Sequence, residues 1–200
     1  MNYEPPILSR KVRVAYGAAE LGLSGAEILI RVGLLIFYTN VIGLRPDFAG
    51  YAIAIGVFWD ALTDPFMGRI SDRASFHKER RRPFLMPGAV GLAISLVLLF
   101  SCPNFENQLS KFLYLMITYL LTNTFMTIVS VPHTALAADL SCEETIRTEL
   151  FAWRLFFGNL GLILGTALPA LATFYFDGFV SPDFLSSLCI GFFIIIFTLI

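Results

Sequence analysis

Residues 12–43 read VRVAYGAAELGLSGAEILIRVGLLIFYTNVIG, an apolar run far longer than a helix in a soluble core needs. About 20 apolar residues in a helix are enough to cross the hydrocarbon core of a bilayer. Comparable runs occupy residues 48–70, 84–101, 111–137, 150–175 and 183–200. Their apolar residues are continuous rather than alternating, which favours membrane-spanning helices over barrel strands. The sequence therefore predicts an all-α membrane protein with six spans.

The predicted organisation is a short segment, residues 1–11, followed by one six-helix bundle, residues 12–200. Turn residues and charges separate the spans at 43–47, 73–83, 103–107, 139–149 and 177–183. The sixth run extends to the last residue with no polar flank. We therefore expect the chain to be cut in or just after its sixth helix.

The composition agrees with a membrane protein and argues against several other classes. Hydrophobic residues make up 56% and charged residues 14%, whereas a soluble domain carries about 25% charged residues. The net charge of −1 gives no reason to expect a nucleic-acid partner. The cysteines, Cys102, Cys142 and Cys189, are odd in number and lack paired spacing, so we predict neither a disulfide framework nor a zinc site. A basic N-terminus leads directly into a long helix without a cleavage site, which indicates a retained first span.

Basic residues fall almost entirely on one side of the predicted membrane. Arg45 and Lys111 lie on one side, and the other side holds Arg10, Lys11, Arg13, Arg69, Arg73, Lys78, Arg80, Arg81, Arg82 and Arg147. Short loops rich in Lys and Arg stay in the cytoplasm. We therefore expect a plasma (inner) membrane protein whose N-terminus and whose loops after the second and fourth spans are cytoplasmic.

Three of the predicted spans carry a polar stripe, because their polar residues recur every three or four positions on one helical face. The stripes consist of Tyr16, Glu20, Ser24, Glu27 and Arg31; of Asp60 and Asp64; and of Asn123, Thr127, Ser130 and Thr134. An ionisable residue inside a span costs about 2.5–3.5 kcal/mol on insertion and is usually functional. The stripes therefore predict a hydrated cavity between helices. In the alternative interpretation, Glu27 pairs with Arg31 and the hydroxyl groups bond back to their own helices.

A cation site is the physical consequence of two aspartates on one helical face. Asp60 and Asp64 have Cβ atoms about 5–6 Å apart, and in a low-dielectric site both stay ionised only if a cation lies between them. Pro65 lacks an N–H group, so the carbonyl of Ala61 loses its helical partner. Oxygen ligands suit Na⁺, and Pro132 likewise frees the carbonyl of Ile128 beside Thr127. We predict a site for Na⁺ or H⁺ made by Asp60, Asp64 and Thr127, with these carbonyls as further ligands, and no other metal or cofactor. A simple packing kink is the alternative for each proline.

Arg154 lies one turn into the fifth span. It either extends to the membrane surface or enters the cavity as a donor to substrate or to a carboxylate. Gly158, Gly161 and Gly165 follow on its face and predict close helix packing. For His133 we favour a hydrogen-bonded structural role over a functional one.

Two enzymatic alternatives fit the sequence poorly. Ser130 and His133 have no acid partner at helical spacing, and the chain lacks the Gly-x-Ser-x-Gly turn of many hydrolases. An intramembrane aspartyl protease needs aspartates on two facing helices, whereas Asp60 and Asp64 share one helix. We therefore predict that the protein is not an enzyme.

Four stretches resemble one family of transporters. They are YGAAELGLSG…FYTNVIGL, WDALTDPFMGRISDR, RRRPFL and VPHTALAADLSCEETIRTELFAWR, which together extend from about residue 11 to at least residue 170. They look like the glycoside–pentoside–hexuronide:cation symporters, the melibiose-permease type within the major facilitator superfamily. The resemblance implies twelve helices in two six-helix bundles that work by alternating access. The present chain covers the first bundle only.

The resemblance also implies roles for individual residues. The family's cation-site acids correspond to Asp60 and Asp64, its cation-site threonine to Thr127 and its cavity arginine to Arg154. A second set resembles the superfamily loop that latches the cytoplasmic gate, and it consists of Gly68, Asp72, Arg73, Arg81 and Arg82. Charge that merely sets topology is the alternative for this second set.

The sequence departs from the melibiose type at the sugar site. Ser24 and Ser130 stand where those permeases have sugar-binding aspartates, Leu23 replaces a lysine, and Thr134 replaces a sugar-stacking tryptophan. These changes argue against α-galactosides. Either Glu20 or Glu27 is then the acceptor for substrate hydroxyl groups. The predicted substrate site consists of Glu20, Ser24, Glu27, Ser130, Thr134 and Arg154.

The predicted function is cation-coupled symport of a sugar, glycoside or uronide. Its partners are a small-molecule substrate, a monovalent cation, the lipid bilayer and a second six-helix bundle. A related branch carries lysophospholipids with Na⁺ and shares the VP-x-(S/T)-A-L stretch, so an organic-solute carrier of that kind is one alternative. A non-transporting membrane scaffold or truncated product is an alternative of another class.

Overall fold

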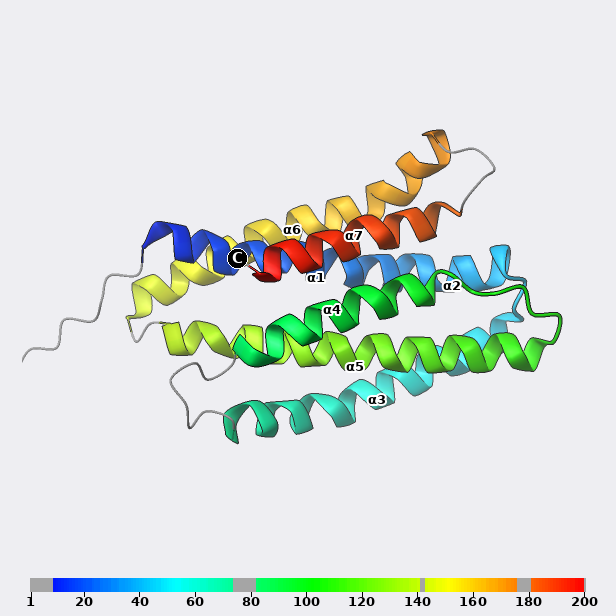
Figure 1. Cartoon of the computed structure of the whole chain (residues 1–200), viewed down its shortest axis with the longest axis horizontal. Coiled ribbons are helices and arrows are strands. Elements are labelled where there is room, and N and C mark those ends of the chain that lie inside the picture. Colours follow the sequence, from blue (N-terminus) through cyan, green and yellow to red (C-terminus); the bar gives the residue numbers. More distant parts are fainter. Residues whose placement is uncertain (1–8, 74–81, 141–142, 176–180, 200) are drawn as a thin grey trace, which may run out of the picture.

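Six helical rods make up the chain in the computed structural model, which describes residues 9–73, 82–140, 143–175 and 181–199. The first rod combines α1 (Arg10–Ile28), the π-helical turn η1 (Leu29–Gly33), α2 (Leu34–Ile36) and a second π-helical turn, η2 (Phe37–Val41). The other rods are α3 (Pro46–Arg73), α4 (Arg82–Leu99), α5 (Gln108–Leu140), α6 (Glu144–Tyr175) and α7 (Pro182–Leu199). They run back and forth along the long axis of the molecule (Figure 1), and the described residues contain no strand. The predicted all-α fold is confirmed.

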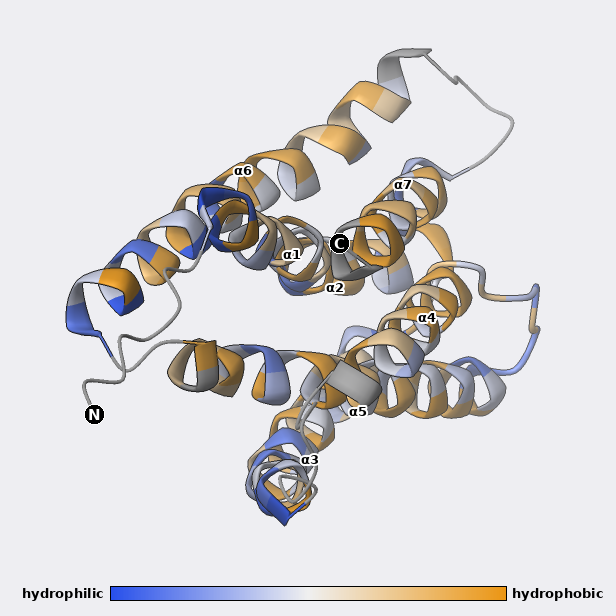
Figure 2. Ribbon diagram, turned by 60° about the vertical axis from the view of Figure 1, so that its left-hand side comes forward, coloured by the Kyte–Doolittle hydropathy of each residue, from blue (hydrophilic) through white to orange (hydrophobic). Residues whose placement is uncertain are grey.

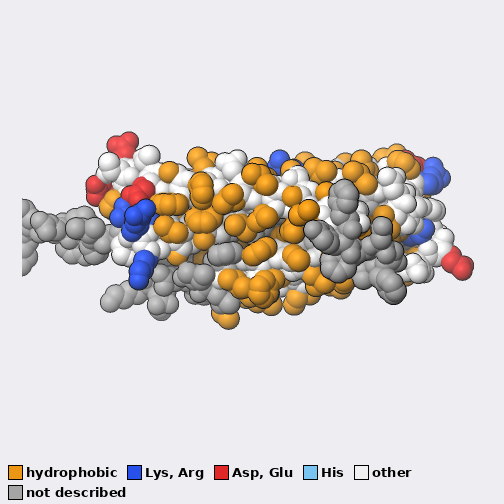
Figure 3. Space-filling view, turned by 90° about the horizontal axis from the view of Figure 1, so that it is seen from above, with side chains coloured by type: hydrophobic (Ala, Val, Ile, Leu, Met, Phe, Trp, Pro, Cys, Tyr) orange, Lys and Arg blue, Asp and Glu red, His pale blue; other side chains and the backbone are white. Residues whose placement is uncertain are grey.

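Length and hydropathy single out three helices that can cross a membrane, Arg10–Val41, Gln108–Ala138 and Glu144–Thr173. Phe84–Leu99 and Pro182–Ile196 are shorter apolar helices. The remaining helix, α3, holds Asp60 and Asp64 in its second half. Hydrophobic side chains cover the middle of the surface seen in Figure 3, and charged side chains gather toward both ends. A long apolar belt between two charged ends is the surface of an integral membrane protein.

Two features of the helices differ from the prediction. The acidic stretch 139–149 was expected to be a break, but α6 begins inside it at Glu144. A helix extends beyond its apolar part when its first turn is acidic, because the positive end of the helix dipole attracts carboxylates. Figure 2 shows these hydrophilic residues at the start of α6. The π-helical turns of the first rod were not predicted. A continuous apolar run does not mark the position at which one turn holds an extra residue.

The helices form two groups that meet along α4 and α7. In one group α1 packs against α6 and α7, and in the other α5 packs against α3 and α4. The core that joins them includes Phe37, Tyr38 and Phe100, all at most 2% exposed. The Tyr38 hydroxyl donates a hydrogen bond of 2.8 Å to the carbonyl of Leu99, which satisfies its polar group within this core.

Glycines allow α1 and α6 to approach closely, as the sequence predicted. A Cβ atom at Gly165 would lie 2.5 Å from the carbonyl oxygen of Gly25, and one at Gly161 would collide with the carbonyl oxygen of Leu21. Small residues at such positions let two backbones touch. This contact positions Glu20 on α1 opposite Arg154 on α6.

Candidate functional site

The first part of the candidate site lies along the contact between α3 and α5. Asn123 Nδ2 donates a hydrogen bond of 3.1 Å to Asp60 Oδ2. One turn further along both helices, Thr127 Oγ1 donates a hydrogen bond of 2.8 Å to Asp64 Oδ1. The four-residue spacing on each helix brings both pairs onto facing stripes. The structure thus brings together the three predicted cation-site residues and adds Asn123.

The hydrogen-bond donors to the two aspartates are neutral side chains. No Lys or Arg among the described residues forms an ion pair with either of them. Asp60 Oδ1 is buried and has no hydrogen-bond partner, whereas Asp64 is exposed. A buried carboxylate oxygen without a partner is costly, so a positive ion beside Asp60 is the occupant that these residues fit. The proline at 65 leaves the Ala61 carbonyl, one residue from Asp60, without an intrahelical partner.

The second part of the candidate site is an ion pair between α1 and α6. Arg154 Nε donates a 2.6 Å hydrogen bond to Glu20 Oε2, and Arg154 Nη2 donates one of 3.3 Å to Glu20 Oε1. Both side chains are largely buried, with 19% and 16% of their surface exposed. Arg154 therefore does not extend to the membrane surface but takes the predicted alternative, donation to a carboxylate. Its bidentate geometry is the strong form of such a pair.

His133 lies against this ion pair. Its Nε2 is 3.0 Å from the carbonyl oxygen of Tyr16, and its ring stacks on the Tyr16 ring with centroids 4.6 Å apart. The hydrogen bond expected for His133 is present, and a structural rather than a functional role stays a prediction. Its second nitrogen, Nδ1, lies 3.6 Å from Glu20 Oε2 and has no hydrogen-bond partner.

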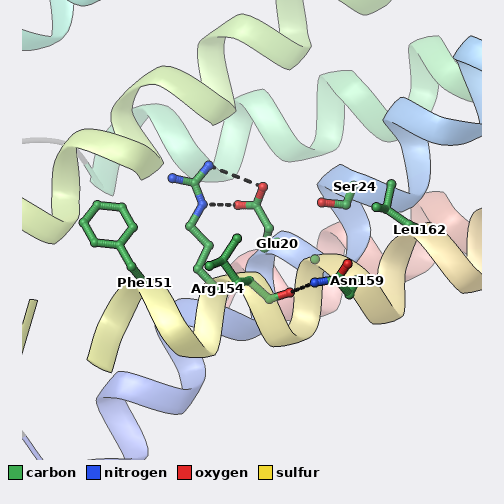
Figure 4. Close-up of a pocket in the computed structure, with 8 residues that line it drawn as sticks. Glu20, Ser24, Phe151, Arg154, Asn159 and Leu162 are labelled. Carbon is green, nitrogen blue, oxygen red and sulfur yellow. Dashed lines mark hydrogen bonds and ion pairs between the residues drawn. The ribbon is translucent and has the colours of Figure 1, made fainter. Parts of the chain in front are cut away.

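A pocket of about 480 Å³ opens beside Glu20 and Arg154. Ser24 on α1 and Asn159 on α6 contribute further polar groups to its wall, and Phe151 and Leu162 contribute apolar ones (Figure 4). This mixture of an apolar wall with a few convergent polar groups is typical of a small-molecule site.

Other predicted residues lie apart from this pocket. Glu27 pairs with Arg31 at 2.5 Å, with both side chains well exposed, and Thr134 Oγ1 donates to the Ser130 carbonyl of its own helix. Both contacts match the alternative interpretation of the stripes, in which the polar groups satisfy one another locally. Of the predicted gate residues, Gly68, Asp72 and Arg73 lie near the end of α3. Arg81 lies outside the described residues, and only the backbone of Arg82 is described.

Several residues of the aspartate site and of the pocket were absent from the predicted site, among them Asn123, Asn159, Phe151 and Leu162. Asn123 opens the polar stripe of α5, so its spacing was visible, but an amide alone does not indicate an ion site. Asn159 and Phe151 lie on a mostly apolar helix and carry no pattern of their own. Among the described residues, no group of three or more His, Cys, Asp or Glu side chains is arranged to hold a metal ion.

The fold and these two centres together define a helical integral membrane protein with charged groups held between its helices. Residues 15–200 match the model of the family described as MFS/sugar transport protein, and the chain belongs to that family.

Individual relatives agree with this assignment. The inner membrane symporter YicJ of Escherichia coli is 30% identical over 165 residues, which cover 81% of this chain and 35% of the relative. The isoprimeverose transporter of Lactiplantibacillus pentosus is 28% identical over 83% of this chain and 34% of its own length. The sodium-dependent lysophosphatidylcholine symporter 1 of Xenopus tropicalis is 28% identical over 79% of this chain and 30% of its own length. The chain thus spans about a third of the length of the curated relatives that it matches.

Proposed function

We propose that the chain is the N-terminal six-helix bundle of a cation-coupled symporter that works by alternating access. One observation carries this proposal: Asp60 and Asp64 lie four residues apart between helices, with neutral donors and no basic partner among the described residues. Such a pair is tolerable in a membrane when a cation enters and leaves. Membership of a sugar-transport family supports the same conclusion. The proposed activity moves a solute without changing it chemically.

In this proposal the cation binds at Asp60 and Asp64, with Thr127 as a neutral ligand and the carbonyl oxygens of Ala61 and Ile128 as further ligands. Thr127 and Asn123 already join α5 to α3 at these aspartates. Binding of Na⁺ or H⁺ neutralises the two carboxylates and strengthens this contact between the helices. Coupling is then reciprocal, because each ligand raises the affinity for the other.

The proposed substrate is a sugar, glycoside or uronide that binds in the pocket beside Arg154. Glu20 accepts hydrogen bonds from hydroxyl groups, Arg154 donates to hydroxyl or carboxylate oxygens, and Ser24 does both. Glu27, Ser130 and Thr134 remain proposed contributors from outside the pocket. They require a second six-helix bundle to close over the same face.

We also propose an orientation of the protein in the membrane. We place the N-terminus in the cytoplasm on the distribution of Lys and Arg, and the protein in the plasma (inner) membrane by analogy with the inner membrane symporter YicJ. The end of α3, with Gly68, Asp72 and Arg73, together with Arg81 and Arg82, forms the cytoplasmic gate. In the sequence these residues stand directly before and within a basic loop.

A second candidate substrate is a lysophospholipid carried with Na⁺. The lysophosphatidylcholine symporter among the relatives favours it, and so do the apolar side chains Phe151, Leu155 and Leu162 in the pocket wall. A sugar and a lysolipid differ in the apolar area that they bury, so direct competition distinguishes them.

Uptake by the full-length protein in sealed vesicles tests the proposal. Candidate sugars, glycosides, uronides and lysolipids are offered with an imposed Na⁺ or H⁺ gradient. We expect one gradient to stimulate uptake of one class, and Asp64→Asn to remove most of that stimulation because it deletes a charged ligand. Asp47→Asn is the matched control, since Asp47 pairs with Arg45 at the exposed start of α3. Equal stimulation of Asp64→Asn and the unmodified protein would contradict the proposed cation site.

A further inference from the structure

The ring of His133 is held in one orientation by α1. Its Nε2 lies 3.0 Å from the Tyr16 carbonyl oxygen, and the Tyr16 hydroxyl donates a hydrogen bond of 3.1 Å to the His133 carbonyl. The two rings stack with an interplanar angle of 18°. The His133 side chain is only 3% exposed, so packing also opposes its rotation.

This orientation fixes where the ring carries its hydrogen. A carbonyl oxygen is only an acceptor, so Nε2 must be the donor and must carry the hydrogen. In the neutral ring, Nδ1 is then an unprotonated acceptor. It lies 3.6 Å from Glu20 Oε2, which is also an acceptor, and it has no hydrogen-bond partner. Two acceptors that face each other in a buried place need a hydrogen between them.

We propose that His133 and Glu20 form a proton site, separate from the aspartate pair on α3. A proton from water binds Nδ1 and forms an N–H bond directed at Glu20 Oε2. The proton donor is a hydronium ion: one of its O–H bonds breaks, a water molecule leaves, and the imidazole becomes an imidazolium that pairs with the carboxylate. The site lies between α1 and α5, whereas the aspartates lie between α3 and α5.

The charged groups around His133 determine how its protonation affects the Glu20–Arg154 pair. The ionisable groups that face it are Glu20 and Tyr16 from α1 and Arg154 from α6. Glu20 Oε2 is the oxygen that also accepts the 2.6 Å hydrogen bond from Arg154 Nε. A protonated His133 therefore competes with Arg154 for the same oxygen. Protonation loosens the Glu20–Arg154 pair and turns the guanidinium toward the pocket that both residues line.

The link between this proton and a pocket ligand rests on the proposed function, whereas the proton site itself does not. With His133 protonated, Arg154 binds a carboxylate or hydroxyl oxygen of the solute. With His133 neutral, Arg154 returns to Glu20. The proton and the solute thus favour each other's binding.

Histidine NMR of the purified full-length protein in lipid nanodiscs tests the proton site without any transport assay. The imidazole nitrogens are labelled with ¹⁵N and followed between about pH 4 and pH 9, a range that spans the usual titration of His. We expect one signal to titrate at Nδ1 with Nε2 protonated throughout. That signal should be absent from His133→Gln, whose amide still donates to the Tyr16 carbonyl. His77→Gln is the control, because the chain's other histidine has no role in the proposed site.

Two charge variants give opposite expectations. Glu20→Gln removes the negative partner, so the proton affinity of His133 should fall at least about tenfold. Arg154→Gln removes the competing positive charge, so the affinity should rise by a similar factor. If His133→Gln does not fold, these shifts still identify the signal in the unmodified background. The proposal is overturned if no Nδ1 signal titrates in this range, or if both variants leave its midpoint unchanged, which indicates a water or other donor between the two acceptors.

Discussion

Three carboxylates at contacts between helices, those of Glu20, Asp60 and Asp64, have partners of two different kinds. Glu20 is neutralised by the guanidinium of Arg154, whereas Asp60 and Asp64 accept hydrogen bonds from an amide and a hydroxyl. A neutral donor stabilises a carboxylate without cancelling its charge. This difference is why we propose a cation site at the aspartates and not at Glu20.

Removal of the Thr127 hydroxyl tests the proposed cation site at the aspartates. Thr127→Val keeps the size of the side chain but removes the donor to Asp64 Oδ1. A hydrogen bond to a charged group contributes about 1.5–3 kcal/mol, so the apparent cation affinity in uptake should fall about tenfold or more. Thr127→Ser should restore most of it.

Thr118→Val is the matched control on the same helix. The Thr118 hydroxyl donates to carbonyls of its own helix, at Tyr114 and Leu115, and forms no hydrogen bond with either aspartate. Its removal should leave cation affinity within about twofold of the unmodified protein. Equal losses in Thr118→Val and Thr127→Val would mean that the effect is general to α5 rather than specific to the site.

The positions of Glu20 and Arg154 depend on how closely α1 approaches α6. Glycines at 161 and 165 bring the two backbones together, and this approach sets the separation of Glu20 and Arg154, which come from opposite helices. A bidentate pair needs both side chains within hydrogen-bond distance. The geometry of the ion pair and the pocket therefore depends on residues that carry no functional group.

Adding one methyl group to this contact should separate the helices. In Gly161→Ala the new Cβ collides with the Leu21 carbonyl, and overpacking of this kind costs about 1–3 kcal/mol of stability. The thermal unfolding temperature in detergent should fall by several degrees. Gly50→Ala is the control, because Gly50 lies in α3 with no atom within 4 Å of an added Cβ. There alanine should be neutral or slightly stabilising.

A smaller effect at Gly161 than at Gly50 would contradict the close contact. A loss of stability at Gly161 should also weaken solute binding, since Glu20 and Arg154 move apart. That second measurement separates a change in the helix contact from a general loss of folding.

The whole molecule is a bundle whose two ends differ in charge. The start of α1, the end of α3, the start of α4, the end of α5 and the start of α6 lie at one end (Figure 1). The turns between η2 and α3 and between α4 and α5 lie at the other. Basic residues concentrate at the first end in the sequence, and on the positive-inside rule we propose that this is the cytoplasmic end.

Cysteine labelling measures this orientation. In a protein with Cys102, Cys142 and Cys189 replaced by serine, a membrane-impermeant maleimide should label Ser9→Cys only in inside-out vesicles. Asn104→Cys, in the exposed turn between α4 and α5, should be labelled only in right-side-out vesicles. The opposite pattern would invert the proposed topology and with it the direction of the proposed gate.

The sequence alone determined the class of protein, the number of helices and the polar faces that they carry. These properties follow from local patterns, because the hydropathy of each run and the period of about 3.6 residues of its polar positions depend only on residues close together in the chain. The prediction located Asp60, Asp64 and Thr127 for the same reason. It placed the start of α6 too late and did not include the π-helical turns, since both depend on details that apolar periodicity does not record.

Only the tertiary structure decided which charges neutralise one another. Glu20 and Arg154 are separated by 134 positions in the chain, as His133 and Tyr16 are by 117. Whether such residues meet depends on how each helix is rotated about its axis and on how closely it packs. For Glu20 and Arg154, the glycines of α1 and α6 allow the close approach. The polar and apolar faces of each helix are a local property of the sequence, whereas the contacts between side chains of different helices follow from the packing of all six helices.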